Sequence, residues 1–243
     1  MIPEAIEWCV TPCPWFARRS GLLAAQIAIR HRAIRCRSAW KPHLDACRKF
    51  FSAAIGSGPR EGRVVILGSG HLNDFDLRFL QSRFEKLTLV DAVHPLEIQV
   101  RALISKGRIE LRSTDLSTPE KFIADLVAQS DWAISSCLLS QLPLFARRGD
   151  SRSIFSRHLE LLTLAPRSIL ITDVAERTVG QAEWSSILDD FPLPPADAEW
   201  IWTIAPTGEN GPRAQERLVR ACRKSRPGLV FEINARQSDN FQR

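Results

Sequence analysis

From residue 63 onward, short apolar runs alternate with stretches long enough to form helices. We expect strands over residues 63–67, 86–91, 108–112, 131–136 and 168–173, and helices over residues 74–84, 95–104, 119–128, 151–164 and 181–188. Short strands separated by helices are typical of a parallel sheet that is covered on both faces. The predicted fold class is therefore α/β, with a doubly wound, mostly parallel sheet.

The last part of the chain departs from this alternation. Residues 200–204, 217–222 and 228–233 are rich in β-forming side chains, and no stretch of helical length separates them. Strands joined without a helix between them pair in antiparallel fashion. We therefore expect the sheet to have an antiparallel C-terminal end.

The chain before this alternating region is different in character. Residues 1–14 contain three prolines and are expected to be irregular, a helix is expected over residues 15–37, and Pro42 is expected to open a second helix. A Gly/Ser/Pro break at residues 56–59 ends this part. The predicted organisation is a basic helical N-terminal cap at residues 1–58, followed by an α/β domain at residues 59–243. We expect Trp8, Trp15 and Trp40 to anchor the cap to the domain rather than to form a lid.

The positive charge of the protein belongs to this cap. Nine Lys and Arg residues against three Asp and Glu residues within residues 1–50 account for the whole formal net charge of +6. Basic helices can bind an anionic ligand or RNA, here through residues 18–49. No nucleic-acid-binding motif accompanies them, so we favour a solvated or packed basic face.

Composition also bears on location and on metal binding. No apolar run reaches the ~20 residues that cross a bilayer, so we expect no membrane contact and a cytoplasmic location. The six cysteines include no C-x2-C pair, so we expect neither a disulfide scaffold nor a metal site. The sequence does not indicate an oligomeric state.

Polar and glycine residues follow the expected strands. Gly68, Asp91, Asp115, Ser136 and Asp173 all lie at or just past strand ends. Because right-handed crossovers bring the carboxyl ends of parallel strands to one edge of the sheet, these residues should converge there. Ligands of open α/β sheets bind at that edge.

The first of these strand ends has the pattern of a nucleoside site. Glycines at 68 and 70 allow a sharp turn and a close approach of the backbone to a ligand, and the next helix is expected to begin near Asn73. Asp91 follows Gly70 by 21 residues, at the end of the next strand, where an acid accepts hydrogen bonds from ribose hydroxyls. The dinucleotide fingerprint requires a third glycine where this chain has Asn73, which disfavours NAD.

Here the chain resembles a divergent member of the class I S-adenosylmethionine-dependent methyltransferases, which are Rossmann-like. Residues 64–70 (VVILGSG) match the glycine-rich first motif, residues 89–91 (LVD) the ribose-binding motif, and residues 112–115 (RSTD) the adenine-side motif. Residues 131–142 (DWAISSCLLSQL) take the place of the substrate-side motif. The resemblance covers residues 60–235, and the antiparallel end agrees with it.

The resemblance implies S-adenosylmethionine as cofactor and methyl transfer to a small or medium-sized acceptor as activity. The cofactor-binding residues that it implies are Gly68, Ser69, Gly70, Asp74, Asp91, Asp115 and Ser136. Gln141 and Glu176 are the substrate-side candidates. Asp74 would replace the missing family acid by binding the methionine amino group; its alternative role is to cap a helix.

Two departures from the family pattern keep other functions open. Ile66 stands where the family has an acid, and Leu72 stands where it has a third glycine. The sequence shows no unambiguous catalytic base, and His71 and His94 are weak candidates. The main alternative is a non-catalytic methyltransferase-like scaffold or binding protein. An RNA methyltransferase and an NAD-dependent oxidoreductase are less favoured.

Overall fold

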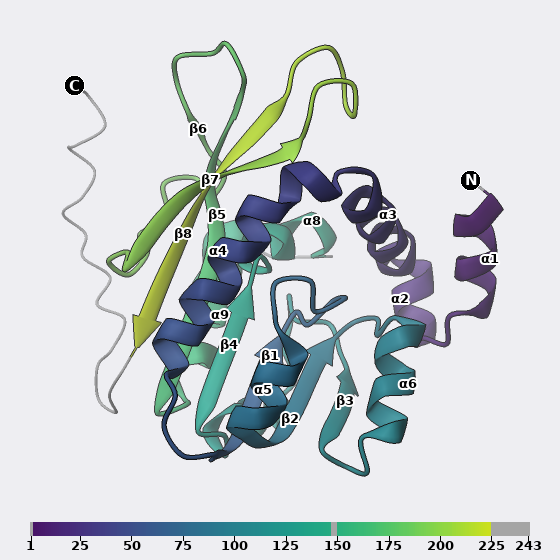
Figure 1. Ribbon diagram of the computed structural model, residues 1–243, viewed down its shortest axis with the longest axis vertical. Coiled ribbons are helices and arrows are strands. Elements are labelled where there is room, and N and C mark those ends of the chain that lie inside the picture. The colour runs from purple at the N-terminus through teal and green to yellow at the C-terminus, as the bar shows by residue number, and fades with distance from the viewer. Residues whose placement is uncertain (1, 147–149, 225–243) are drawn as a thin grey trace.

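A computed structural model describes residues 2–146 and 150–224 (Figure 1). Within them, eight strands form one sheet, and its hydrogen-bonded order is β3-β2-β1-β4-β5-β8-β7, with β6 paired to β5. The strands are β1 (Glu61–Leu67), β2 (Phe84–Asp91), β3 (Ile109–Ser113), β4 (Trp132–Ser136), β5 (Arg167–Thr178), β6 (Ser185–Ser186), β7 (Ala198–Ala205) and β8 (Gln215–Lys224). Strands β1 to β5 pair in parallel, whereas β6, β7 and β8 pair in antiparallel fashion. The predicted fold class is confirmed.

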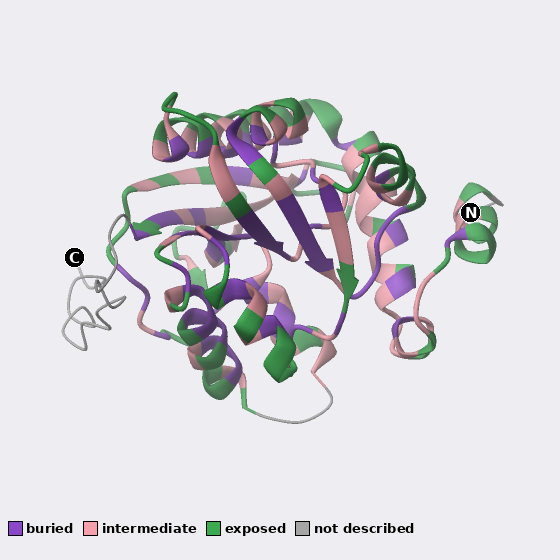
Figure 2. Ribbon diagram, turned by 90° about the horizontal axis from the view of Figure 1, so that it is seen from below, coloured by how far each residue is buried: buried purple, intermediate pink, exposed green. Residues whose placement is uncertain are grey.

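Helices cover both faces of the sheet. Helices α4 (Arg37–Ile55), α5 (Leu77–Arg83) and α6 (Leu96–Ile104) pack on one face, and α7 (Lys121–Ala128) and α9 (Ser151–Thr163) pack on the other. The sequence of β1 shows why, because Val64 and Ile66 face the first core and Val65 and Leu67 face the second. All four side chains are fully buried, as expected for a strand that is covered on both faces. Figure 2 shows buried residues along the central strands of the sheet.

Four helices precede β1. They are α1 (Ile2–Val10), α2 (Trp15–Arg19), α3 (Leu22–Arg35) and α4. Helix α3 lies over the carboxyl edge of the sheet, and α2 and α3 share a small core with Ala92 and Val93 of the segment after β2 (Figure 1). Helix α4 runs across the sheet and packs on β7. The N-terminal helices therefore cover the edge at which the strand ends converge.

Prolines explain two errors of the sequence-based prediction. Residues 1–14 are not irregular throughout, because Pro3 lies in the first turn of α1, where a proline fits a helix, and Pro12 and Pro14 follow its end. Pro42 does not open a helix either. It lies inside α4, which begins five residues earlier at Arg37 and accommodates the loss of one backbone donor.

Two other predicted helices differ from the structure. The helix expected over residues 74–84 begins only at Leu77, because Asp76 caps it by accepting hydrogen bonds from Arg78 N at 2.9 Å and Phe79 N at 3.2 Å. Residues 181–188 form no helix and instead contain β6. The strand expected over residues 228–233 lies outside the described residues. Among the described helices, none is both long and apolar enough to cross a membrane.

Candidate functional site

A cavity of about 470 Å³ opens at the carboxyl edge of the sheet, under helix α3. Nine of the residues singled out from the sequence line it: Gly68, Ser69, Gly70, His71, Asp74, Asp91, Asp115, Ser136 and Gln141. His94 and Glu176 do not line it. Asp173 lines it too, so the residues expected at the strand ends converge on one concave site although Gly68 and Asp173 are 105 residues apart in the sequence.

The glycine turn and Asp91 are joined directly. Gly68 and Gly70 have φ angles of +70° and +46°, which favour glycine. The turned backbone lets Gly70 N donate a hydrogen bond to Asp91 Oδ2 at 2.8 Å, while Ala92 N donates to Asp91 Oδ1 at 2.7 Å. Burial raises the pKa of Asp91, and these backbone donors oppose that shift. Asp91 Oδ1 also accepts from Val93 N at 3.4 Å, whereas Oδ2 keeps a further lone pair for a ligand hydroxyl.

The cap helix α3 approaches the glycine turn closely. A Cβ atom on Gly70 would lie 3.4 Å from Gln26 Nε2 of α3, and a Cβ on Gly68 would lie 2.9 Å from atoms of Leu138. Ser69 Oγ and Gln26 Nε2 are buried and have no hydrogen-bond partner among the described residues. Buried polar atoms are normally paired, so these two atoms at the cavity wall fit the polar groups of a ligand.

Asp74 is held by a hydrogen bond and by a buried histidine. Ser136 Oγ donates to Asp74 Oδ2 at 2.7 Å, and His43 Nε2 of α4 lies 3.8 Å from Asp74 Oδ1. Trp200 Nε1 donates to His43 Nδ1 at 3.0 Å, which fixes the ring proton on Nε2. Burial lowers the pKa of His43, and Asp74 opposes that shift. The neutral ring therefore directs an N–H toward Asp74.

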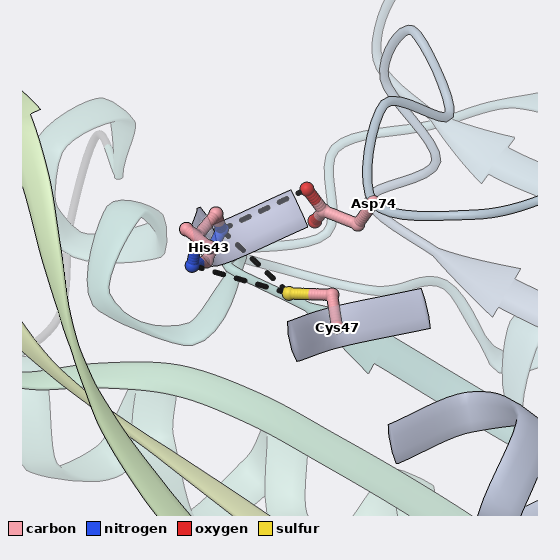
Figure 3. Close-up of side chains that lie close together, drawn as sticks. All are labelled: His43, Cys47 and Asp74. Atoms are coloured by element: carbon pink, nitrogen blue, oxygen red, sulfur yellow. Dashed lines mark hydrogen bonds and ion pairs between the residues drawn. The ribbon is translucent and has the colours of Figure 1, made fainter. Parts of the chain in front are cut away.

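Cys47 completes the group drawn in Figure 3. Its Sγ lies 3.7 Å from His43 Nε2, and burial raises its pKa far above the usual thiol value. The three side chains are close enough to hold a metal ion. However, a metal needs the lone pair of Nε2, which carries the proton as long as Trp200 donates to Nδ1. We interpret the group as support for Asp74.

Asp115 closes the far side of the cavity. Its Oδ1 accepts hydrogen bonds from Ser117 N at 2.9 Å and from Ser117 Oγ at 2.6 Å. These hydrogen bonds hold the loop that follows β3, and they involve only Oδ1 of Asp115. The cavity residues are arranged in the order of the strands that they follow, β3-β2-β1-β4. In that order they are Asp115, Asp91, the glycine turn and Ser136.

Comparisons with known proteins identify the fold of the chain. No family model and no curated protein sequence matches the chain. It is similar to the solved structure of Burkholderia thailandensis 1,6-didemethyltoxoflavin-N1-methyltransferase with bound 1,6-didemethyltoxoflavin and S-adenosylhomocysteine. The TM-score is 0.50 at 16% identity, and the match covers 88% of this chain and 93% of that one. The chain has the class I methyltransferase fold.

Two further solved structures match with lower scores. A DhpI–SAM–HEP complex gives a TM-score of 0.39 at 17% identity, with 82% of this chain and 97% of that chain covered. An S-adenosylmethionine-dependent methyltransferase from Mesorhizobium loti gives a TM-score of 0.37 at 15% identity, with 76% and 98% covered.

The two histidines occupy different places in this methyltransferase fold. His71 lines the cavity, but its Nδ1 lies 3.1 Å from Glu97 Oε1 and its Nε2 lies 3.4 Å from Gln26 O, so acceptors engage both ring nitrogens. His94 is buried behind Asp91, where Nε2 donates to Arg112 O at 3.1 Å and burial lowers the pKa. His94 therefore supports the segment after β2 and does not reach the cavity.

Asp173, which was expected at the ligand-binding edge of the sheet without an assigned role, and Arg217, which was not singled out, also line the cavity. Burial raises the pKa of Asp173 to about 6, although the nearby Arg217 opposes the shift. Arg217 Nη2 lies 2.8 Å from Glu176 Oε2, so Glu176 contacts a cavity residue without lining the cavity itself. The strand expected over residues 168–173 in fact continues to Thr178, so Asp173 lies inside β5 rather than at its end, and nothing in the sequence pairs residue 217 with it.

Several basic residues of the N-terminal helices form hydrogen bonds or ion pairs within the protein. Arg18 donates to the backbone oxygens of Trp8 and Thr11, and Arg48 donates to Asn73 O at 2.7 Å. Two ion pairs follow: Arg30 with Glu7 at 2.8 Å, and Arg35 with Glu209 at 2.6 Å. The pair with Glu209 connects α3 to the loop between β7 and β8.

Proposed function

We propose that the protein transfers a methyl group from S-adenosylmethionine to a small or medium-sized acceptor. The observation that carries this proposal is the joining of the Gly68–Gly70 turn to Asp91 by the Gly70 N to Asp91 Oδ2 hydrogen bond, at the wall of one cavity. A bent backbone beside a strand-terminal acid suits a nucleoside. S-adenosylmethionine, when bound, supplies a methyl group activated by a positively charged sulfur.

The cavity residues fit the parts of this cofactor in order. Asp91 would hold the ribose hydroxyls, and Asp115, one strand further out, would lie on the adenine side. Asp74 would bind the methionine amino group, which compensates for Ile66 at the position of the family acid. Ser69 Oγ and Gln26 Nε2, which lack partners among the described residues, would hydrogen-bond to polar atoms of the cofactor.

The size and cover of the cavity support a small acceptor. A volume of about 470 Å³ lies within the ~300–1,000 Å³ of small-molecule sites. Helix α3 contributes Leu22, Gln26 and Ile29 to the lining, so the acceptor would contact the cap. The 1,6-didemethyltoxoflavin bound in the Burkholderia thailandensis structure is likewise a small molecule.

Calorimetric titration with S-adenosylmethionine, S-adenosylhomocysteine and NAD tests the proposal. We expect both adenosyl compounds to bind the wild type and to bind Asp91→Ala much more weakly. Asp125→Ala, which changes an exposed acid on α7, is the matched control and should bind like the wild type. Binding of NAD alone would favour an oxidoreductase, and binding of none of the three would favour a scaffold protein.

A further inference from the structure

Asp173 lies beyond the sulfur end of the proposed cofactor site. Across the edge of the sheet, the adenine-side and ribose-side acids belong to the ends of β3 and β2, the glycine turn follows β1, and Ser136 ends β4. Asp173 is on β5, the next strand in this order. A cofactor laid from β3 to β4 therefore directs its reacting end toward Asp173.

The pairing of β5 with β8 is irregular beside this residue. The β5–β8 pairing shifts register between Asp173 and Ala175. Such bulges redirect a side chain and are frequent next to active sites. The Asp173 side chain lines the cavity although only 4% of the residue is exposed.

The Asp173 carboxylate lacks a partner for one of its oxygens. Its Oδ1 is buried and has no hydrogen-bond partner at normal distance and angle among the described residues, and the nearby Ser140 hydroxyl lowers the pKa of Asp173 without fully satisfying that oxygen. A buried carboxylate oxygen at a cavity wall is suited to a donor that arrives with a ligand. The other acid near it, Asp74, already accepts a hydrogen bond from Ser136.

Charged and titratable groups from several elements surround Asp173. Arg217 on β8 stabilises its ionised form, while Asp74 after β1 and Glu176 on β5 disfavour it. The thiols of Cys47 and Cys137, whose pKa values burial raises, are neutral neighbours. Burial outweighs Arg217, and the resulting pKa of about 6 leaves Asp173 mostly ionised at neutral pH yet basic enough to take a proton.

We propose that Asp173 is the proton acceptor for methyl transfer, and that the methyl acceptor therefore presents an N–H or O–H group to it. This inference rests on the proposed function. Asp173 takes the proton from the acceptor atom as the lone pair of that atom bonds to the methyl carbon. The methyl–sulfur bond breaks with its electron pair on sulfur, which leaves S-adenosylhomocysteine and a protonated Asp173 that returns its proton to water.

The first experiment needs no acceptor. S-adenosylmethionine carries a positive sulfur that S-adenosylhomocysteine lacks, so an ionised Asp173 at the reacting end favours the former. We measure both dissociation constants by calorimetry between pH 5 and pH 7.5. We expect the preference for S-adenosylmethionine to grow at least about threefold with pH in the wild type and to be flat in Asp173→Asn.

Two further variants separate the titration of Asp173 from a folding defect in Asp173→Asn. Asp125→Asn, an exposed change on α7, should keep the wild-type pH dependence. Arg217→Gln removes the cation that lowers the pKa of Asp173, so its pH midpoint should move upward, an effect that a purely structural role would not produce. If the wild type binds neither compound, the proposed function fails; if both bind with a preference that ignores pH, the role of Asp173 alone fails.

The second experiment tests the class of acceptor. We incubate the protein with radiolabelled S-adenosylmethionine and phenol, uracil or pyridine, of which only pyridine is methylated without losing a proton. We expect transfer to phenol or uracil, with a loss of ~100-fold or more in Asp173→Asn while its affinity for S-adenosylhomocysteine stays within about threefold. Transfer to pyridine alone, transfer to none, or an unchanged rate in Asp173→Asn would overturn the proposal.

Discussion

Gly70 N lies 2.8 Å from Asp91 Oδ2, and this hydrogen bond connects the turn after β1 to the end of β2. The bond orients the carboxylate before any ligand arrives. Because Gly68 N and Ser69 N also donate to Val90 O, at 2.8 and 3.3 Å, the turn and the strand end form one rigid unit. Preorganisation of this kind lowers the entropy cost of binding.

Asp91→Asn is expected to weaken S-adenosylhomocysteine binding on the order of 100-fold, because the ribose hydroxyls would then meet an uncharged amide with a single acceptor oxygen in place of a carboxylate. Calorimetry measures the change. An analogue without the 2′ and 3′ hydroxyls provides the matched ligand, since wild type and variant should bind it within about threefold of each other. An equal loss for both ligands would show that Asp91 acts on the shape of the turn and not on the ribose.

Gly68→Ala is expected to destabilise the protein more than Gly107→Ala. Both glycines have positive φ angles, +70° and +81°, so each substitution costs about 1 kcal/mol of backbone strain. Only at Gly68 would the new Cβ lie 2.9 Å from Leu138, which adds about 1–3 kcal/mol of overpacking. Urea unfolding gives both values, and similar losses in the two variants would mean that Leu138 moves aside freely.

The sequence predicted the sheet better than the site, for physical reasons. Alternating apolar runs are local signals, so the five parallel strands and the antiparallel end followed from them, and the strand ends placed Gly68, Asp91 and Ser136 at one edge. The contributions of Gln26 and His43 depend on where α3 and α4 dock on the sheet. Docking is a tertiary property that no local pattern in the cap encodes.

The error at Pro42 also has a tertiary cause. Proline was interpreted as a helix boundary, yet Pro42 lies inside α4 because the rest of that helix buries Trp40, Cys47 and Phe51 against the sheet. Tertiary burial of this kind outweighs the loss of one backbone hydrogen bond.

Trp40→Ala is expected to lower the free energy of unfolding by about 3–5 kcal/mol. The Trp40 ring packs edge-on against Trp202 at 5.0 Å, and its Nε1 donates to Ile204 O at 2.9 Å. Trp15→Ala is the matched control, because Trp15 is 73% exposed and its loss should cost less than about 0.5 kcal/mol. Equal losses would contradict the view that Trp40 is the tryptophan that anchors the cap.

Asp173→Asn is expected to make the ligand-free protein more stable at pH 7.5 and to have little effect near pH 4. The pKa of Asp173 is about 6 in the folded protein, against 3.8 for a free carboxyl, so the folded state binds the proton more tightly. Its contribution to stability is fully present below pH 3.8 and is lost as the pH rises through 6. A shift of roughly two pKa units lowers the free energy of unfolding of the wild type by on the order of 3 kcal/mol at high pH. Asparagine has no charge to bury, so the variant does not lose this stability. Urea unfolding at both pH values measures the difference, with Asp125→Asn as a control that should show no such trend. A difference that is the same at pH 4 and pH 7.5 would mean that Asp173 does not titrate between them, and it would remove the electrostatic basis for its role as proton acceptor.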